Sequence, residues 1–526
     1  MKGRHERIKI KGWSGSAAVW LLLVPLFVLI VLKTDFLPQV ARLGDTSFTK
    51  VADEMVQKVS SLGLDRARWQ QQQTLDVAKL EDSVVGTSDE LTGHVDANNE
   101  DSNQPNQQIL AMSRSKDSRL INSDVAAAKT SHLSCNFSSA HMDTCAMDGD
   151  IRIHGRSGVV YVVASSDYRP ENATAVIRPY PRKWEQATME RVRQITIRST
   201  APPGADTDGG GAIIPLRCTV ARDMPAVVFS TGGYSVNFFH TMNDILLPLY
   251  ITAREHGGRV QLLAANYDRR WTAKYQHALA ALSMYPVVDL DADAAVRCFP
   301  SARVGVESHR VLGIDTPLTG SNGYTMVGFL AFLRSAYSLP RHAVTTHTPS
   351  PRRPRVVMVL RRKSRALTNE AEVVAAVAEA GFEVVAAGPE EAGDVAGFAA
   401  TVNSCDVMVG VHGAGLTNMV FLPRNGTVVQ IIPWGGMKWP CWYDYGEPVP
   451  AMGLRYVEYE VAANETTLRE RYPMDHPVFA DPVSIHRKGF NHLWSTFLNG
   501  QNLTLDVNRF KAVMAEVYTS ITAAPV

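Results

Sequence analysis

The chain has 526 residues, of which 45% are apolar, so it exceeds the length of one ordinary domain and can bury a large core. Its formal charge is +1, because 53 Lys and Arg residues almost balance 52 Asp and Glu residues. This balance excludes a general electrostatic attraction for nucleic acid, and the sequence carries no nucleic-acid-binding motif. We therefore expect no nucleic-acid partner.

The N-terminus has the pattern of a membrane anchor. Residues 1–11 contain five Lys and Arg residues, and residues 12–32 are uncharged. A span needs about 20 such residues, and the basic cluster before it predicts that the N-terminus stays cytosolic. A cleaved signal peptide is the alternative, but no small-residue cleavage site follows residue 32. We predict an uncleaved signal anchor with type II topology and a lumenal remainder.

The cysteines and glycosylation motifs agree with this topology, because all of them follow the predicted span. Among the six cysteines we predict that Cys135 pairs with Cys145, since they flank a short loop, and that Cys405 is a small core residue. No Cys and His spacing is typical of a metal site. The predicted glycosylation sites are Asn136, Asn172, Asn425, Asn464 and Asn502.

Residues 33–130 are predicted to be a disordered lumenal stem. They are poor in aromatic residues and contain tracts of Gln and Asn, for example at residues 70–73 and 102–108. Such a segment buries too little apolar surface to fold by itself. A short helix or coiled coil near residues 62–80 is the alternative.

Residues 131–345 are predicted to form a first α/β domain. A strand at residues 226–230 leads through Gly233 and Tyr234 into a helix that begins near Asn237. Other runs typical of strands lie at residues 158–163, 194–198 and 260–264.

His240 and Asp244 lie four residues apart in the predicted helix and therefore share one face. A histidine with a pKa near neutrality can take a proton from a substrate, so we predict both as catalytic residues. Asp244 either orients His240 or is itself the base. The alternative is a helix cap beside a core histidine that has no catalytic role.

A proline-rich linker near residues 340–355 precedes a predicted second α/β domain, residues 352–526. Its strands and helices alternate, which predicts a parallel sheet whose ligands bind at the carboxyl ends of the strands. We expect a cleft between the two domains and a final helix, residues 509–520, that packs back onto the first domain. The predicted strands lie at residues 355–360, 382–385, 405–410 and 426–432.

The turn at residues 411–418 is the most informative segment of this domain. It follows a buried strand and reads Val-His-Gly-Ala-Gly-Leu-Thr-Asn. Glycines let a ligand approach the backbone, and a helix that begins there would suit a phosphate. The turn is neither a Walker A loop nor a G-x-G-x-x-G fingerprint, which disfavours a dinucleotide-dependent oxidoreductase. A turn that serves only packing is the alternative. The predicted ligand-binding residues are His412, Gly413, Ala414, Gly415 and Asn418.

Several of these segments together resemble glycosyltransferase family 61. The resemblance runs from about residue 131 to residue 520 and rests on Gly233-Tyr234, on Asn237 to Asp244, on the basic loop at residues 361–365 and on residues 410–418. It implies a GT-B fold, in which two Rossmann-like domains face a cleft, a UDP-sugar donor, inversion at the anomeric carbon, and no metal or other cofactor. Residues 322–337 are most similar to plant members that transfer arabinofuranose or xylose to xylan.

The resemblance also gives roles to residues and partners. A leaving diphosphate needs cations, so Arg362, Lys363 and Arg365 are predicted to bind the donor, with Arg362 and Arg365 favoured; a solvated loop is the alternative. The anchor and stem suit a Golgi membrane enzyme, and assembly with other glycosyltransferases is a further partnership that this layout allows. The alternatives are transfer to protein-linked glycans and a non-catalytic lumenal glycan-binding protein.

Two further motifs are ambiguous. Asp289, Asp291 and Asp293 imitate a D-x-D metal site, but such triplets are common in turns, and we interpret this one as a loop. An aromatic cluster around Cys441 either stacks on sugar rings or belongs to the core. It consists of Trp439, Trp442, Tyr443 and Tyr445.

Overall fold

The computed structural model describes residues 131–164, 174–200, 216–344 and 352–523, all of which belong to one compact unit of the chain. The predicted anchor, the stem and the Asn172 sequon lie outside the described residues and stay predictions. Within the described ranges, no helix is long and apolar enough to cross a membrane. We call residues 131–344 the first region and residues 352–523 the second region.

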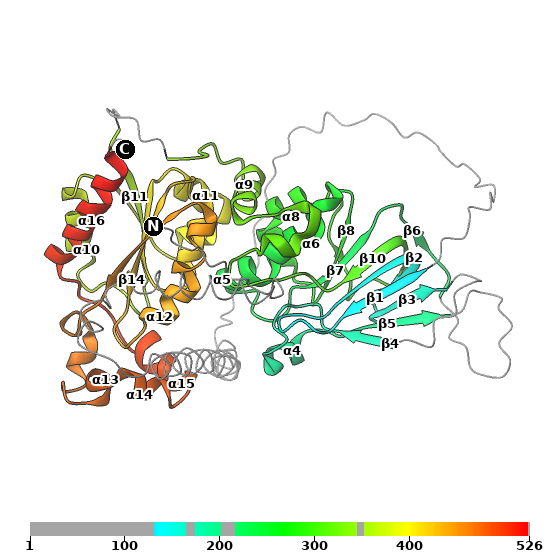
Figure 1. The fold of residues 1–526 in the computed structure, drawn as a ribbon, viewed down its shortest axis with the longest axis horizontal. Helices are drawn as coiled ribbons and strands as arrows, with labels where there is room; N and C mark the ends of the chain where they lie inside the picture. The colour runs from blue at the N-terminus through cyan, green and yellow to red at the C-terminus, as the bar shows by residue number, and fades with distance from the viewer. Residues whose placement is uncertain (1–130, 165–173, 201–215, 345–351, 524–526) are drawn as a thin grey trace, which may run out of the picture. The chain divides into compact units, whose positions relative to one another are not determined.

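The first region contains a mixed sheet of ten strands in the order β4-β5-β3-β2-β10-β7-β8-β9, with β1 beside β2 and β6 beside β10 (Figure 1). Strands β7 to β10 form a parallel part, whereas β2 is antiparallel to both β3 and β10. The strands are β1 (His132–Asn136), β2 (Thr144–His154), β3 (Val159–Val163), β4 (Thr174–Ile177), β5 (Ile195–Thr200), β6 (Val220–Ala221), β7 (Ala226–Ser230), β8 (Gln261–Ala265), β9 (Val288–Asp289) and β10 (Val296–Val304).

This sheet differs from the expected Rossmann-like domain. Only a short turn joins β2 to β3, and a parallel pair needs a much longer crossover, so the two strands form an antiparallel hairpin. Before β7 only α4 lies between two strands, and most of the helices follow β7. The helices of this region are α4 (Gln186–Arg191), α5 (Phe238–His240), the π-helix η1 (Thr241–Leu246), α6 (Leu247–Ala253), η2 (Arg254–His256), α7 (Arg269–Lys274), α8 (Gln276–Leu282), η3 (Thr316–Asn322) and α9 (Met326–Ala336).

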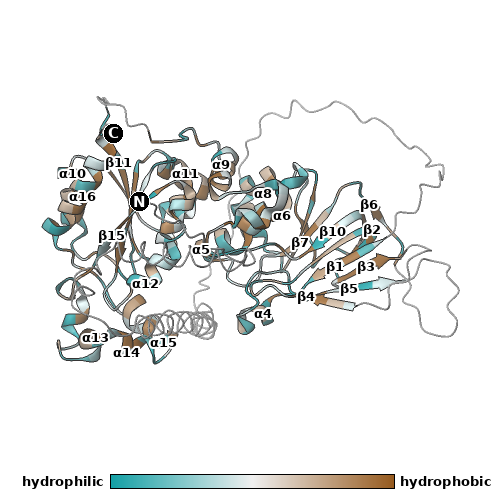
Figure 2. Ribbon diagram, viewed as in Figure 1, coloured by the Kyte–Doolittle hydropathy of each residue, from teal (hydrophilic) through white to brown (hydrophobic). Residues whose placement is uncertain are grey.

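The second region contains a parallel sheet of five strands in the order β12-β11-β13-β14-β15, as the sequence predicts. Its central strands are buried on both faces, and Figure 2 shows them as mostly hydrophobic. After β11 the chain adds β12 on one side of β11, and it then returns to add β13 on the other side. The strand order therefore reverses between β11 and β13. Ligands of such sheets bind at this reversal. The strands are β11 (Arg355–Val359), β12 (Glu383–Ala387), β13 (Val407–Val411), β14 (Thr427–Ile432) and β15 (Arg455–Glu460).

Short helices follow most of these strands. They are α10 (Glu370–Glu379), η4 (Glu391–Gly393), α11 (Val395–Asn403), η5 (Ala414–Phe421), α12 (Lys438–Cys441), the π-helix η6 (Trp442–Gly446), η7 (Pro450–Met452), η8 (Ala463–Glu465), η9 (Thr467–Glu470), α13 (Pro477–Ala480), α14 (Pro482–His486), α15 (Phe490–Leu493), the π-helix η10 (Trp494–Leu498) and α16 (Val507–Thr522).

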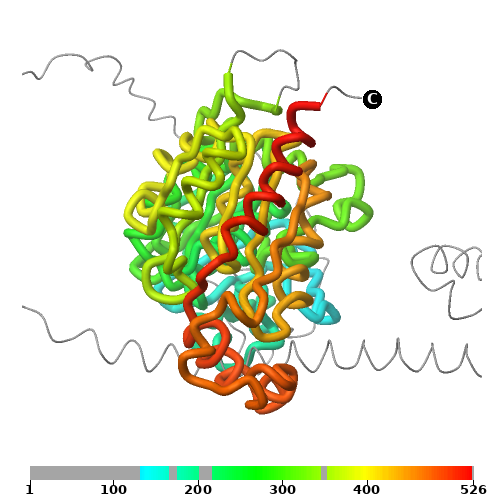
Figure 3. Tube along the Cα trace, turned by 90° about the vertical axis from the view of Figure 1, so that its left-hand side faces the viewer, coloured from blue at the N-terminus to red at the C-terminus, as the bar shows by residue number. Residues whose placement is uncertain are grey.

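The prediction that the final helix packs on the first region is wrong. Helix α16 runs along the outside of the second region beside α10 (Figures 1 and 3). Its apolar face, formed by Phe510, Met514, Val517 and Ile521, is buried in the core of the second sheet. Lys511 also donates to Glu379 of α10 at 2.6 Å. The helical spacing of the apolar residues was clear in the sequence, but it does not say which sheet they cover.

The two regions share one apolar core where α9 meets η5. Tyr337, just after α9, packs edge-on against Phe421 of η5 with ring centroids 5.3 Å apart. Arg334 of α9 donates to the Leu422 carbonyl at 3.2 Å. Phe238 of α5 also contacts Phe421, at 6.4 Å between centroids. These contacts bring the helix that carries His240 and the turn that carries His412 to the same junction.

The structure confirms the disulfide between Cys135 and Cys145, which lie directly opposite each other on β1 and β2. A second disulfide joins Cys218 to Cys298 of β10. Cys405 is a buried, unpaired core residue as expected, and Cys441 is also buried and unpaired.

Four of the predicted glycosylation sites lie on described residues. Asn136, Asn425 and Asn464 are exposed. Asn502 is half-buried, and its side-chain oxygen accepts the Ala366 N–H at 3.1 Å. Glycosylation of all four stays a prediction.

Candidate active site

A glycine turn after β7 shapes the first half of the site. Gly233 has a φ of +67°, and a Cβ there would meet the ring of Tyr180. Because no side chain stands in its way, Tyr180 reaches the turn, and its hydroxyl accepts the Tyr234 N–H at 3.2 Å. Asn237 then begins the helix, since its side chain accepts the Phe239 N–H at 2.9 Å.

The helix that starts at Asn237 becomes π-helical over Thr241–Leu246, and all six residues of this turn are buried. Such turns are rare and are frequently found at functional sites. Asp244 lies inside it, only 1% exposed, and accepts hydrogen bonds from four side chains. The donors are Tyr180 Oη at 2.7 Å, Arg182 Nε at 2.7 Å, His240 Nδ1 at 2.9 Å and Asn243 Nδ2 at 2.6 Å.

These contacts bear on the two roles predicted for Asp244. Burial alone would raise its pKa, but Arg182 and His240 together hold the pKa of this carboxyl well below its ordinary value. A carboxylate with four donors and a low pKa is a weak base. Because it can only accept, it fixes the His240 proton on Nδ1 and leaves the Nε2 lone pair free to take a proton. The geometry therefore favours Asp244 as the orienting residue and His240 as the base.

The environment of His240 supports this role. Burial, followed by the positive charge of Arg182, lowers the pKa of His240 below its ordinary value, so the ring is neutral near pH 7. Its side chain keeps 16% of its surface exposed, which leaves an approach for a substrate. The ring lies between Tyr234 and Phe239, with centroids 4.6 and 5.3 Å away.

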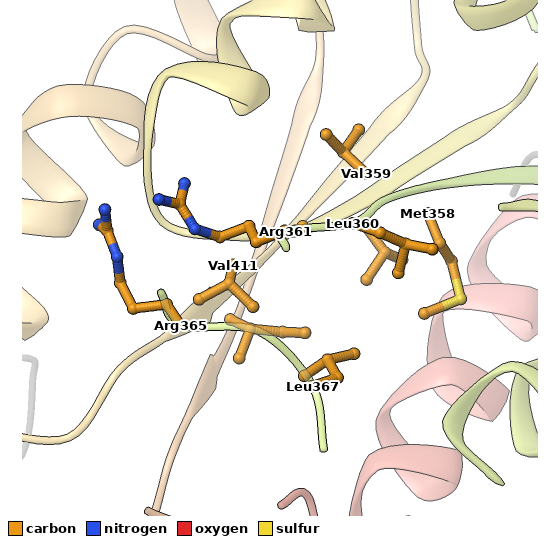
Figure 4. Close-up of a pocket in the computed structure, with 10 residues that line it drawn as sticks. Met358, Val359, Leu360, Arg361, Arg365, Leu367 and Val411 are labelled. Carbon is orange, nitrogen blue, oxygen red and sulfur yellow. The ribbon is translucent and has the colours of Figure 1, made fainter. Parts of the chain in front are cut away.

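The second half of the site lies where the strand order of the parallel sheet reverses. The loops after β11 and β13 carry Arg361, Arg365 and His412, and a pocket at the carboxyl ends of these strands is lined by both arginines. Figure 4 shows the two arginine side chains extending in the same direction, away from Met358 and Leu360. Each is anchored by a carbonyl: Arg361 Nε donates to Ser364 at 2.7 Å, and Arg365 Nη1 donates to His412 at 2.9 Å.

No carboxylate of the described residues forms an ion pair with Arg361 or Arg365. Burial lowers the pKa of Arg361, and burial together with Arg361 lowers the pKa of Arg365 to about 9. Two neighbouring cations without a counter-ion form a binding site for an anion.

The other basic residues of the loop point elsewhere. Arg362 is exposed and donates to Glu370 of α10 at 2.6 Å, and Lys363 is exposed. The sequence favoured Arg362 and Arg365, whereas the structure places Arg361 rather than Arg362 beside Arg365. A donor-binding role for Arg362 and Lys363 stays a prediction.

Gly413 lets Arg361 lie against the turn after β13. It has a φ of +143°, and a Cβ there would meet the Arg361 guanidinium. Ala414 and Gly415 then begin η5, whose first N–H groups have no helical acceptor. Asn418 folds back and donates to the Gly415 carbonyl at 3.0 Å, so in this structure it braces the turn.

A chain of hydrogen bonds fixes the tautomer of the buried His412. The Tyr456 hydroxyl donates to Gln430 Oε1 at 2.5 Å, so the Gln430 amide donates to His412 Nδ1 at 2.8 Å. The His412 proton is therefore on Nε2. Burial, with help from Arg365 and Arg361, holds the pKa of His412 well below its usual range. His412 is thus a neutral donor next to two cations.

Tyr445 connects the two halves of the site. Its hydroxyl donates to the Gly413 carbonyl at 2.8 Å, and its ring contacts Phe239, the neighbour of His240, at 6.0 Å between centroids. Asp444 precedes it, with Oδ2 3.8 Å from His412 Nε2. Burial raises the pKa of Asp444 to about 7, and the positive charge of Arg182 in the first region partly opposes this shift.

Comparison with known proteins identifies the family. The model of the family described as Glycosyltransferase 61 matches residues 238–429, which contain His240, Asp244, Arg361, Arg365 and the His412 turn. The beta-1,2-xylosyltransferase XYXT1 of Oryza sativa subsp. japonica is 40% identical over 403 residues, which are 73% of this chain and 83% of that protein. The chain belongs to glycosyltransferase family 61.

Two further plant proteins are similar to the chain. The alpha-1,3-arabinosyltransferase XAT2 of Oryza sativa subsp. japonica is 40% identical over 385 residues, 73% of this chain but only 64% of that protein. The xylan glycosyltransferase MUCI21 of Arabidopsis thaliana is 33% identical over 419 residues, 76% of this chain and 83% of that protein. The chain thus spans less than two thirds of the length of the rice arabinosyltransferase.

Sequence reasoning missed three residues of this family 61 site. Tyr180 and Arg182 follow β4 and reach Asp244 only through the folded sheet, so no local pattern announces them. Asp444 is the only acidic residue within the aromatic cluster at residues 439–445. A single carboxylate among four aromatic residues was the signal that could have indicated it.

The Asp289 triplet forms the turn after β9, in agreement with its interpretation as a loop. Asp289 caps this turn by accepting the backbone N–H groups of Asp291 and Ala292, each at 3.0 Å. Asp291 forms an ion pair with Arg193, and Asp293 with Arg297 at 2.6 Å. Within the part of the chain that the structure describes, no cluster of three side chains could hold a metal ion. Metal independence stays an expectation.

The arginine geometry predicts which side chains bind an anion. Arg361→Ala, Arg365→Ala and Gly413→Ala should each weaken pyrophosphate binding roughly tenfold, because hydrogen bonds to charged groups are worth about 1.5–3 kcal/mol. The matched control Arg362→Ala should change the affinity less than about twofold, since Arg362 pairs with Glu370. Calorimetric titration measures all four. A loss in Arg362→Ala equal to the others would show that the anion lies elsewhere.

Proposed function

We propose that the chain is an inverting, UDP-sugar-dependent glycosyltransferase that adds a pentose, arabinofuranose or xylose, to xylan. The observation that carries the proposal is the anion site of Arg361, Arg365 and the glycine turn, located at the strand-order reversal of a parallel sheet. The similar plant proteins are named as an arabinosyltransferase, a xylosyltransferase and a xylan glycosyltransferase, and these names support the pentose and the acceptor. A GT-B arrangement of two domains around the site is part of this proposal.

In the proposed reaction the second region holds the leaving group. The diphosphate gains charge as the bond between the anomeric carbon and its phosphate oxygen breaks, and UDP departs. Arg361 and Arg365 stabilise that charge, and the start of η5 offers backbone N–H groups. The neutral His412 donates a hydrogen bond from Nε2–H to the nucleotide sugar beside them. These groups require no metal ion for charge neutralisation, which supports the expected independence from metal.

The first region supplies the base. The acceptor hydroxyl oxygen forms the new bond to the anomeric carbon on the face opposite the diphosphate, and its proton passes to His240 Nε2. Asp244 then stabilises the resulting imidazolium through its bond to Nδ1, and Arg182 keeps Asp244 ionised. One displacement of this kind inverts the configuration.

The aromatic cluster supports a sugar-chain acceptor. Trp439 and Trp442 are 39% and 40% exposed, and Trp439 stacks on Tyr443 with nearly parallel rings whose centroids are 5.4 Å apart. Exposed aromatic faces on α12 and η6 suit the apolar faces of pyranose rings. Tyr445 differs from these residues, because it is buried in the core. A second acceptor class, protein-linked glycans, has no specific support from these contacts.

The proposed location is the Golgi membrane, with the described residues in the lumen. The disulfides and the exposed sequons of the described residues support a secretory compartment. In sealed microsomes, protease should spare all but the extreme N-terminus of the chain. Digestion of residues 131–526 without detergent would contradict the lumenal placement. Assembly with other glycosyltransferases stays a prediction that co-purification from the same membranes tests.

The substrate prediction is tested directly by product analysis. The full chain should transfer pentose from UDP-arabinofuranose or UDP-xylose to xylan oligosaccharides, with an inverted linkage that NMR of the product identifies. UDP-N-acetylglucosamine with protein-linked glycan acceptors is the comparison arm. Binding of xylan oligosaccharides without transfer from any of these donors would favour the non-catalytic glycan-binding alternative, and transfer only to protein-linked glycans would overturn the xylan assignment.

The base prediction concerns turnover. His240→Ala should lower kcat by about 10²-fold or more, the usual scale for the loss of a general base, while the affinity for UDP changes little. Activity requires neutral His240, so the rate should fall as the pH drops through its pKa. Because burial and Arg182 lower that pKa, the acid limb should lie below about pH 6.5. His256→Ala, further along the same helical segment, is the matched control, and EDTA should leave the rate unchanged. Parent-like turnover of His240→Ala would refute the assignment.

A further inference from the structure

Asp444 is a carboxyl group of the site to which the mechanism above gives no role. It lies on the π-helix η6 and is followed by Tyr445, whose hydroxyl bond to the Gly413 carbonyl ties this helix to the anion-binding turn. The distance of 3.8 Å between Asp444 Oδ2 and His412 Nε2 is too long for a hydrogen bond. Asp444 is therefore placed by its own helix beside the anion site, and not by an ion pair.

The carboxyl of Asp444 is left without a partner in the folded protein. Among the described residues, no donor lies within hydrogen-bonding distance of it, although 34% of the side chain is accessible. The nearby cation Arg182 is already occupied by Asp244 and Glu185. Burial raises the pKa of Asp444 to about 7, because an ionised carboxyl that is withdrawn from water and has no donors is destabilised. His412 Nε2–H, opposite it, also has a free hydrogen-bonding position.

The charge of Asp444 excludes the diphosphate as its partner. An anion held by Arg361 and Arg365 would repel a carboxylate that lies beside His412. Sugar hydroxyl groups, in contrast, donate hydrogen bonds to carboxylates, and vicinal hydroxyls match the two carboxylate oxygens. In a nucleotide sugar the ring is joined directly to the diphosphate, so its hydroxyls would reach the neighbourhood of the anion site.

We propose that Asp444 binds hydroxyl groups of the donor sugar, with His412 Nε2–H facing the same ring, and that it contributes to the choice of donor. This inference rests on the proposed function, because it needs a UDP-sugar on Arg361 and Arg365. A role as the acceptor's base fits the contacts less well, since Tyr445 links Asp444 to the donor turn, while His240 in the first region has its own orienting carboxylate.

The test compares UDP with UDP-sugars, because UDP lacks the ring that Asp444 would bind. Titration calorimetry on the full chain should show that Asp444→Ala lowers the affinity for the preferred donor, either UDP-xylose or UDP-arabinofuranose, by about tenfold. This is the scale of one hydrogen bond to a charged group. Its affinity for UDP should stay within about twofold of the parent. Asp444→Asn, which keeps the shape and one acceptor oxygen, should lose less.

Glu460→Gln is the matched control, because this substitution also removes one negative charge. Glu460 lies at the end of β15 and pairs with Lys438 at 3.9 Å. It should bind both ligands like the parent. Unchanged UDP-pentose affinity in both Asp444 variants, or an equal loss for UDP and UDP-pentose, would overturn the inference. If the Asp444 variants bind UDP and UDP-pentose like the parent and lose only turnover, Asp444 would be a second base and not a residue that binds the donor sugar. A parent that binds neither UDP nor a UDP-sugar would overturn the proposed function itself.

Discussion

The second region contains two neighbouring guanidinium groups that pair with no carboxylate of the described residues, and the candidate anion site depends on them. Burial lowers the pKa of both Arg361 and Arg365, and the positive charge of Arg361 lowers the pKa of Arg365 further. The local fold holds them in place: two carbonyl groups accept their hydrogen bonds, Gly413 leaves space, and Arg365 adopts a left-handed backbone at φ +54°. An anion relieves this repulsion, so part of its binding free energy is already stored in the free protein.

The two candidate acidic residues occur in the same kind of local structure. Asp244 lies in the π-helix η1 and Asp444 in the π-helix η6. The two segments are in ring contact through Phe239, the neighbour of His240, and Tyr445, the neighbour of Asp444. Asp244 has four donors and a lowered pKa, whereas Asp444 has no donor among the described residues and a raised pKa. Two carboxyl groups at one junction therefore differ in pKa because of their surroundings, which suits the orienting role proposed for Asp244 and the binding role proposed for Asp444.

The sequence predicted those parts of the site that depend on local pattern. The glycine turn after a buried strand and the four-residue spacing of His240 and Asp244 are features of short segments, and both lie where strand ends and helix geometry place them. The parallel order of the second sheet followed from its alternating elements. The family resemblance was confirmed, although the donor and acceptor it implies remain proposals.

Other parts depend on contacts between distant segments. Arg182 reaches Asp244 across 62 positions of sequence, and the direction of the Arg361 side chain depends on the empty space at Gly413. The antiparallel half of the first sheet was missed because its hairpins were interpreted through the α/β pattern of the later strands. Helix α16 has an amphipathic face that suits either sheet, and only the packing of Phe510 and Met514 settles the choice.

The two buried thiols have a consequence for the lifetime of the protein. Cys405 and Cys441 are inaccessible, and burial raises the pKa of both, so neither forms the thiolate that oxidants attack. Cys441 immediately precedes the π-helix that carries Asp444. If the chain works in an oxidising lumen as proposed, the native packing protects both thiols against oxidation. Each transient opening of the second region would then expose thiols to incorrect disulfides, and the unfolding rate would set how long the site survives.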